Sequence, residues 1–218
     1  MKKILYNKFD KDALADLPLV EFEGRIVVVL TEREAEKASR YLLDQPLLGV
    51  DTETRPSFRK GETHGVSLLQ VATDDTCFLF RLNRMGLCLP VVRLLENTEV
   101  PMIGLSWHDD LTALHRRGDF TPGLFIDLQS MVGRIGIEDL SLQKLYANIF
   151  GQKISKRQRL TNWDADVLTL KQQRYAATDA WACLQLYREL LSLEATGNYR
   201  LIIQPEPTHE PEPTTSSK

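Results

Sequence analysis

The sequence predicts an α/β domain built on a mixed β-sheet of about five strands, one of them antiparallel, flanked by helices. Short apolar runs typical of buried strands alternate along the chain with capped, amphipathic segments typical of helices. Two consecutive apolar runs, 66–73 and 76–82, are separated only by Asp74-Asp75, which indicates a hairpin and therefore an antiparallel pair. The 218 residues are 43% hydrophobic, enough for one core.

The first half of the chain sets out this pattern in order. Residues 1–24 have no clear period, and at most a short helix is expected over 8–16. Residues 25–30 form a β-branched run that predicts a strand. Thr31 with Glu34 has the pattern of a capping box, which predicts a helix reaching about residue 44. A second strand follows at 47–53, and then the hairpin.

The second half continues the alternation. We expect helices at 90–97, at 106–117 with Ser106 as its cap, at 140–150, and at 170–195 after the cap Thr169. Strands are expected at 100–104 and at 124–128, the latter either a short strand alone or a strand leading into a helix at about 129–132. Residues 153–164 are a polar, basic loop. The expected division is an N-terminal extension (1–24), a main domain (25–196), and a C-terminal segment (197–218) whose Pro- and Glu-rich tail is disordered.

Charge and cysteine content exclude several classes of protein. The net charge is −3, of which the last fifteen residues carry −2, so a nucleic-acid site would need a local basic patch. Three cysteines without paired spacing favour a reducing compartment. The N-terminal apolar stretch is too short for a signal peptide or a spanning helix. We therefore expect a cytoplasmic protein with no membrane partner.

Two carboxylates end the strand at 47–53. Side chains alternate across a strand, so Asp51 and Glu53 share one face and Thr52 points to the other. Crowded carboxylates repel each other, and a hard divalent cation with oxygen ligands removes that repulsion. A strand end that reaches solvent, with both acids hydrated, is the ordinary alternative.

Further acidic residues follow on two predicted helices. Asp109 and Asp110 lie after the 100–104 strand, and Tyr175 lies four residues before Asp179, so these last two share one helical face. Each has an ordinary explanation. The helix acids could be exposed, Tyr175 could be a packing residue, and Asp179 could pair with a neighbouring cation such as Arg174.

Together, these residues form three ordered motifs. Asp51-x-Glu53, then Asp110, then Tyr175-x-x-x-Asp179 resembles the DEDD superfamily of 3′–5′ exonucleases, in its tyrosine-bearing subclass. The likeness is to RNase D and Werner-syndrome exonuclease domains, and it covers about residues 25–192. Asp110 rather than Asp109 is chosen because apolar residues follow it at the positions that the family pattern has.

The resemblance implies a ribonuclease-H-like fold and a site for two divalent cations, Mg²⁺ or Mn²⁺, about 3.5–4 Å apart. Asp51, Glu53, Asp110 and Asp179 would be the metal ligands, and Tyr175 would orient the attacking water. The implied substrate is nucleic acid with a free 3′ end, and the product is a nucleoside 5′-monophosphate. DNA is favoured over RNA, although the sequence does not resolve the two. Protein partners are not indicated by the sequence.

Candidate substrate contacts are basic or aromatic residues near these motifs. In the loop before Trp163 they are Lys153, Lys156, Arg157 and Arg159, and after the first motif they are Arg55 and Phe58. A solvated loop, and a core position for Phe58, are the alternatives. His108 could be a general base, although Tyr175 already holds the position that the subclass uses.

Two rival functions remain open on the sequence. A non-catalytic nucleic-acid-binding or scaffold protein could retain the fold, although it would have no physical reason to keep four converging carboxylates. An endonuclease of the same broad fold would typically lack the final Tyr-x-x-x-Asp motif.

Overall fold

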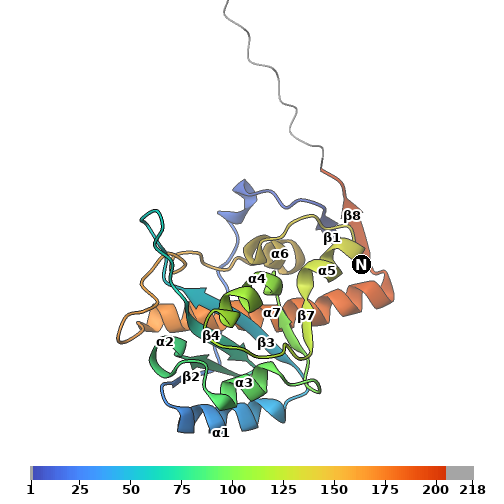
Figure 1. The fold of residues 1–218 in the computed structure, drawn as a ribbon. Coiled ribbons are helices and arrows are strands. Elements are labelled where there is room, and N and C mark those ends of the chain that lie inside the picture. Colours follow the sequence, from blue (N-terminus) through green and yellow to red (C-terminus); the bar gives the residue numbers. More distant parts are fainter. Residues whose placement is uncertain (1, 205–218) are drawn as a thin grey trace, which may run out of the picture.

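The structure is a computed structural model, and it describes residues 2–204 (Figure 1). The Pro- and Glu-rich tail, from residue 205 onward, lies outside the described residues. Within the described part, no helix is both long and apolar enough to cross a membrane.

The main sheet has six strands in the order β2-β5-β4-β3-β6-β7, one more than expected. β4 is antiparallel to both of its neighbours, and the other strand pairs are parallel, so the mixed sheet with one antiparallel strand is confirmed. The strands are β2 (Arg25–Val29), β3 (Leu48–Thr54), β4 (Val66–Ala72), β5 (Thr76–Phe80), β6 (Met102–Gly104) and β7 (Phe125–Asp127). β3 lies inside the sheet, with β4 on one side and β6 on the other.

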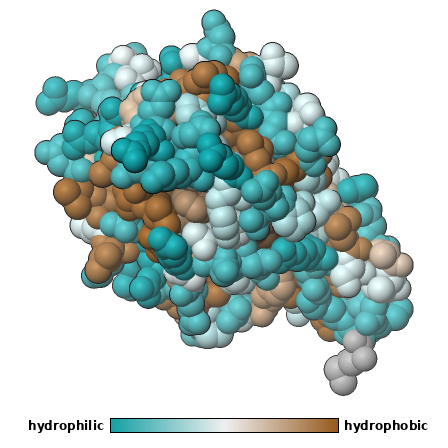
Figure 2. Space-filling view, turned by 90° about the horizontal axis from the view of Figure 1, so that it is seen from below, coloured by the Kyte–Doolittle hydropathy of each residue, from teal (hydrophilic) through white to brown (hydrophobic). Residues whose placement is uncertain are grey.

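Helices cover both faces of this sheet (Figure 1). The helices are α1 (Glu32–Leu43), α2 (Leu82–Met85), α3 (Leu89–Leu95), α4 (Trp107–His115), α5 (Leu128–Arg134), α6 (Leu142–Phe150) and α7 (Leu170–Thr196). One face packs its apolar side chains against α1, α3 and α4. The other face packs against α7, with α5 and α6 beside it. Seen from the side of α1, the surface is mostly hydrophilic with small separate hydrophobic patches (Figure 2).

Local capping sets the ends of the two best-defined helices. Thr31 and Glu34 form the predicted capping box of α1. Thr169 forms another with Gln172 at the start of α7, and Gly197 ends α7 in the left-handed conformation. The caps predicted from the sequence at Thr31, Glu34 and Thr169 are therefore confirmed.

Ser106 is not the side-chain cap that we expected for α4. It adopts a left-handed conformation (φ 58°), and its side chain makes no capping bond. Instead the carboxylate of Asp127, at the end of β7, accepts hydrogen bonds from the backbone N–H groups of Ser106 and Trp107, both at 3.0 Å. Asp127 is remote in sequence, so the local pattern could not identify it as the cap.

A second, two-stranded sheet joins the ends of the described chain. β1 (Lys3–Tyr6) pairs in parallel with β8 (Tyr199–Ile202), an arrangement that the sequence did not predict. The helix expected over 8–16 is only a single 3₁₀ turn, Asp12–Leu14. The hairpin strand expected to reach residue 82 ends at Phe80, and the short helix α2 follows it.

Candidate active site

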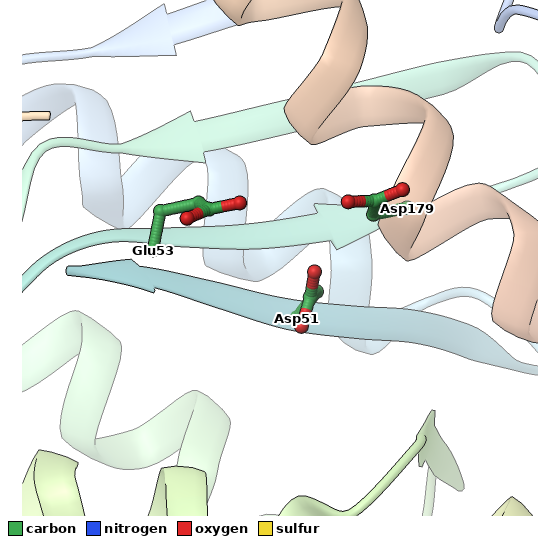
Figure 3. A group of neighbouring side chains, drawn as sticks. All are labelled: Asp51, Glu53 and Asp179. Carbon is green, nitrogen blue, oxygen red and sulfur yellow. The ribbon is translucent and has the colours of Figure 1, made fainter. Parts of the chain in front are cut away.

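Three carboxyl groups from two distant parts of the chain meet on the α7 face of the sheet. Asp51 and Glu53 lie on β3 and Asp179 on α7, and one oxygen of each lies within 4.8 Å of the others. Figure 3 shows that the three side chains point into one common space. Glu53 and Asp179 are 8% and 6% exposed, so this is an interior group of acids and not a hydrated strand end.

Small residues on α7 bring the third carboxylate to the strand. Ala176, Ala177 and Ala180 are fully buried against the sheet, so the backbone of α7 lies close to β3 and β4. Asp179 is adjacent to Ala180 and faces the sheet. It makes no ion pair with Arg174, which instead lies 3.5 Å from Glu21.

The electrostatics of the site are those of crowded, buried acids. Burial, followed by the charge of Asp51, raises the pKa of Glu53 to about 10. Burial raises the pKa of Asp179 to about 7, although hydrogen bonding from Tyr175 and the charge of Lys156 oppose the shift. Burial, with the charges of Asp179 and Asp110, also raises the pKa of Asp51. The folded chain therefore disfavours the charged forms of these carboxyls.

Asp110 is the fourth carboxylate, and it stands beside the group of three. It accepts a hydrogen bond from the hydroxyl of Thr52, the residue that follows Asp51 on β3, and its charge contributes to the raised pKa of Asp51. Burial raises its pKa to about 6, an effect that the Thr52 hydrogen bond opposes. Asp109 is exposed, so of these two neighbouring acids only Asp110 is turned toward β3.

Tyr175 lies next to these acids, one turn before Asp179. Burial raises the pKa of its hydroxyl, and the charges of Asp179 and Glu53 raise it further. Its ring lies 6.0 Å from that of Trp163, which is fully buried. The hydroxyl therefore stays protonated over the physiological range, which suits a hydrogen-bond donor and not a base.

The donor set fits a hard divalent cation. Carboxylate oxygens are the ligands that Mg²⁺ and Mn²⁺ prefer, and a positive charge would stabilise the ionised acids that burial disfavours. No cysteine or histidine belongs to this group of ligands, which argues against a zinc site. Asp51, Glu53 and Asp179 would hold such an ion directly.

The basic loop is fastened to the start of α7. The side-chain amide of Gln172 donates to the Thr161 hydroxyl at 3.0 Å and to the Asn162 carbonyl at 3.2 Å. The hydroxyl of Ser67, on β4, donates to Asp164 at 2.8 Å. These bonds position the loop, and with it the buried Trp163, beside the acids.

The predicted substrate contacts occupy two segments. Lys156 and Arg159 lie close enough to the acids that their charges lower the pKa values of Asp179 and Glu53, respectively. Arg157 is exposed, and the ammonium of Lys153 donates to the carbonyl of Ala15.

The second segment follows β3. Arg55 is exposed there, and Phe58 is 79% exposed, so the core position considered for Phe58 is wrong. His108 is also exposed on α4.

Three residues at the site escaped the sequence reasoning. Thr52 orients Asp110, and Asp127 caps the helix that carries it. Gln70 lies directly opposite Asp51 on β4 and is fully buried, and neither of its amide atoms has a hydrogen-bond partner among residues 2–204. Only Gln70 had a local signal, as a polar residue inside the apolar run 66–73.

Comparison with known proteins places this geometry in a family. A sequence model described as 3′–5′ exonuclease matches residues 26–193, more than half of the chain. A mouse protein named bifunctional 3′–5′ exonuclease/ATP-dependent helicase WRN is 30% identical over 198 residues, which cover 86% of this chain and 14% of the mouse protein. An Arabidopsis thaliana 3′–5′ exonuclease is 28% identical, covering 82% of this chain and 67% of the relative. DNA polymerase I of Aquifex aeolicus is 27% identical, covering 74% and 26%, respectively.

Solved structures share the fold. The exonuclease domain of Aedes aegypti Nibbler superposes with a TM-score of 0.71 at 21% identity, covering 84% of this chain and 94% of that one. Escherichia coli RNase D gives a TM-score of 0.70 at 20% identity, and the match covers 80% of this chain and 46% of the RNase D chain. The family match, the mouse relative and the shared fold agree with the family predicted from the three acidic motifs. The chain belongs to the DEDD 3′–5′ exonucleases of the Werner-syndrome exonuclease and RNase D type.

Proposed function

We propose that this chain hydrolyses nucleic acid from the 3′ end and releases nucleoside 5′-monophosphates in a reaction that needs divalent metal. The observation that carries the proposal is the meeting of Asp51, Glu53 and Asp179 within 4.8 Å, beside Tyr175. Because the chain spans only 14% of the mouse relative, activity, substrate and partners are proposals for this protein.

The proposed cofactor is two ions, Mg²⁺ or Mn²⁺, held by the four carboxylates. Asp51, Glu53 and Asp179 would hold one, and Asp51 with Asp110 would hold the other. When bound, such ions lower the pKa of a coordinated water and stabilise the charge on a leaving oxygen.

The residues of the chain itself prepare the substrate. Tyr175, protonated at neutral pH, donates a hydrogen bond that orients the water, while Thr52 holds Asp110 in place. Phe58 and Arg55 would contact the terminal nucleotide, and their exposure after β3 supports this role.

DNA is the proposed substrate in preference to RNA. The support is that a relative named DNA polymerase I is 27% identical, whereas the structure named RNase D is 20% identical and shares the fold. The cytoplasm is the proposed location, and it is supported by three free thiols, at Cys77, Cys88 and Cys183.

The test is degradation of matched DNA and RNA oligonucleotides labelled at the 5′ end, with Mg²⁺ or Mn²⁺. Asp51→Asn and Asp110→Asn should each cut the rate by orders of magnitude, whereas the exposed neighbour variant Asp109→Asn should match wild type. A metal-dependent ladder that shortens from the 3′ end supports the proposal, and the two substrates show which sugar is preferred.

Two outcomes would favour the rivals. Cleavage of a circular single strand would indicate an endonuclease. Intact oligonucleotides with either metal, together with no metal-linked rise in melting temperature, would indicate a binding or scaffold protein.

A further inference from the structure

A pocket of about 770 Å³ opens beside Tyr175. Its walls are residues 19–21 of the N-terminal segment, loop residues 153–158 with Gln143 of α6, and the face of α7 from Leu170 to Thr178. The volume lies within the range of about 300–1,000 Å³ that is usual for ligand pockets. Since Tyr175 and Thr178 belong to its wall, the pocket adjoins the proposed active site.

The pocket is strongly cationic, although the whole chain has a net charge of −3. Its charged wall residues are one acid, Glu21, and five cations: Lys153, Lys156, Arg157, Lys171 and Arg174. The cations lie on both the loop and the helix, so they can contact more than one anionic group at a time. Such a concentration of positive charge selects a polyanionic ligand.

Further cations lie near Lys156, one of the pocket-lining residues. The pKa of Lys156 is lowered by its burial and by the charges of Arg159, Lys144 and Lys11, whereas the charge of Asp179 opposes the shift. Lys156 lines the pocket, and its charge also lowers the pKa of Asp179, so it lies near both the pocket and the carboxylate group.

The N-terminal wall is fixed to the loop by backbone–backbone hydrogen bonds, and to α7 by a backbone N–H that donates to a side chain. The N–H of Val20 donates to the Lys153 carbonyl at 3.0 Å, and the N–H of Lys153 donates to the Pro18 carbonyl at 2.9 Å. The N–H of Phe22 donates to the Thr178 hydroxyl at 2.9 Å. Residues 19–21 precede the family match, which begins at residue 26, so this wall is added by the chain outside the matched domain.

Only some of the five cations are free to bind a ligand. Lys153 donates to the Ala15 carbonyl, Lys156 lies 3.3 Å from the Ser141 hydroxyl, and Arg174 lies 3.5 Å from Glu21. Arg157 and Lys171 are exposed, and among residues 2–204 neither has a carboxylate within ion-pairing distance. These two side chains are the best placed to bind a phosphate group of a ligand.

We propose that this pocket binds backbone phosphates of the substrate strand on the 5′ side of the nucleotide being removed, and that residues 19–21 form part of that binding surface. The inference rests on the proposed exonuclease function. A strand is favoured over a single free nucleotide because the cations line two walls. Leu19 and Leu170, 51% and 79% exposed, add apolar surface for sugars and bases.

Binding in a chelator tests the inference without any turnover. The probe is a single-stranded 12-residue oligonucleotide with a 5′ fluorophore, followed by anisotropy from low to moderate salt with the full chain. Arg157→Ala and Lys171→Ala should each weaken binding several-fold and reduce the slope of log K against log[salt] by about 0.7–1. Lys37→Ala, an exposed lysine on α1, is the matched control and should leave both unchanged.

Glu21→Gln provides a test in the opposite direction. Removing the single acid of the pocket frees Arg174, so this variant should bind the oligonucleotide more tightly, with a steeper salt slope. The four substituted side chains are all exposed: Glu21, Lys37, Arg157 and Lys171. Urea unfolding should therefore show that each variant folds like wild type.

Two further comparisons complete the test: a long strand against a dinucleotide, and a strand against a free nucleoside 5′-monophosphate. In the degradation assay the pocket variants should raise KM for the 12-residue strand and leave its kcat and the cleavage of a dinucleotide unchanged. If only the binding of nucleoside 5′-monophosphate weakens, the pocket is a product site and the inference fails. A further outcome is that wild type produces the ladder while Arg157→Ala and Lys171→Ala bind the oligonucleotide as tightly as Lys37→Ala. In that case the inference about the pocket fails and the proposed exonuclease activity is supported. If wild type binds the strand in the pocket yet never produces a ladder, the exonuclease proposal is the one that fails.

Discussion

The carbonyl oxygen of Ala180 lies 2.1 Å from the position that a Cβ atom on Gly49 would occupy. Gly49 precedes Asp51 by two residues on β3, and Ala180 directly follows Asp179 on α7. The absence of a side chain at residue 49 thus allows the helix to approach the strand where the carboxylates of Asp51 and Asp179 meet.

Gly49→Ala should therefore both destabilise the protein and separate its acids. The added methyl must push α7 away from β3, at a cost of about 1–3 kcal/mol in the free energy of unfolding. We also expect a smaller rise in melting temperature when Mn²⁺ is added. Urea unfolding and thermal melts measure the two effects. The control is Gly133→Ala on α5, where no neighbouring atom lies within 4 Å and the change should be neutral or slightly stabilising. Equal behaviour of the two variants would contradict the role given to Gly49.

Stability of the metal-free protein should fall as pH rises from about 4 to about 7. The pKa values of Asp110 and Asp179 are raised to about 6 and about 7, whereas both titrate near 4 in the unfolded chain. In this interval the folded protein binds more protons than the unfolded chain, so the free energy of unfolding decreases with pH. Mn²⁺ should remove much of this decline, because it stabilises the ionised carboxylates.

Urea unfolding between pH 4.5 and 8, in chelator and in Mn²⁺, measures this dependence. Asp179→Asn should flatten the chelator curve, since its amide does not titrate. Stability of the metal-free wild type that rose through this interval would show that the acids are not held in the buried, crowded state described above.

Tyr175→Phe should lower kcat by roughly 10²-fold, the usual effect of removing one positioned hydrogen-bond donor. The ring still packs on Trp163, so the variant should fold normally and keep its metal-linked rise in melting temperature. His108→Ala, an exposed change on α4, is the control and should retain full activity. Loss of metal binding in parallel with activity would mean that Tyr175 supports the metal site and does not act on the water.

Gln70→Met should stabilise the metal-free protein by about 1 kcal/mol or more. The Gln70 amide is fully buried without a partner, and methionine fills a similar volume without that desolvation cost. Gln173→Met is the matched control, because the Gln173 amide donates to the Leu168 carbonyl at 2.8 Å and its loss should not stabilise. Chemical denaturation in chelator compares them. Destabilisation by Gln70→Met would reveal a partner for the amide, for which the Asp51 carboxylate lies in register on β3.

Patterns among neighbouring residues in the sequence determined most of the helices and strands. They also determined that the first motif places two carboxylates side by side. Side-chain alternation places Asp51 and Glu53 on one face of a strand, and capping residues fix the starts of α1 and α7, because both effects act within a few residues. The same reasoning failed for Ser106, whose expected capping role belongs to Asp127.

The tertiary structure decided whatever depends on contacts between distant residues. The approach of α7 at Gly49 brings Asp179 to Asp51, and the hydroxyl of Thr52 turns Asp110 rather than Asp109 toward the sheet. The pairing of β1 with β8, and the cationic pocket built from residues 19–21 and α7, likewise join parts of the chain far apart in sequence. Periodicity and caps report only near neighbours, whereas packing and strand pairing depend on which surfaces the whole chain buries together.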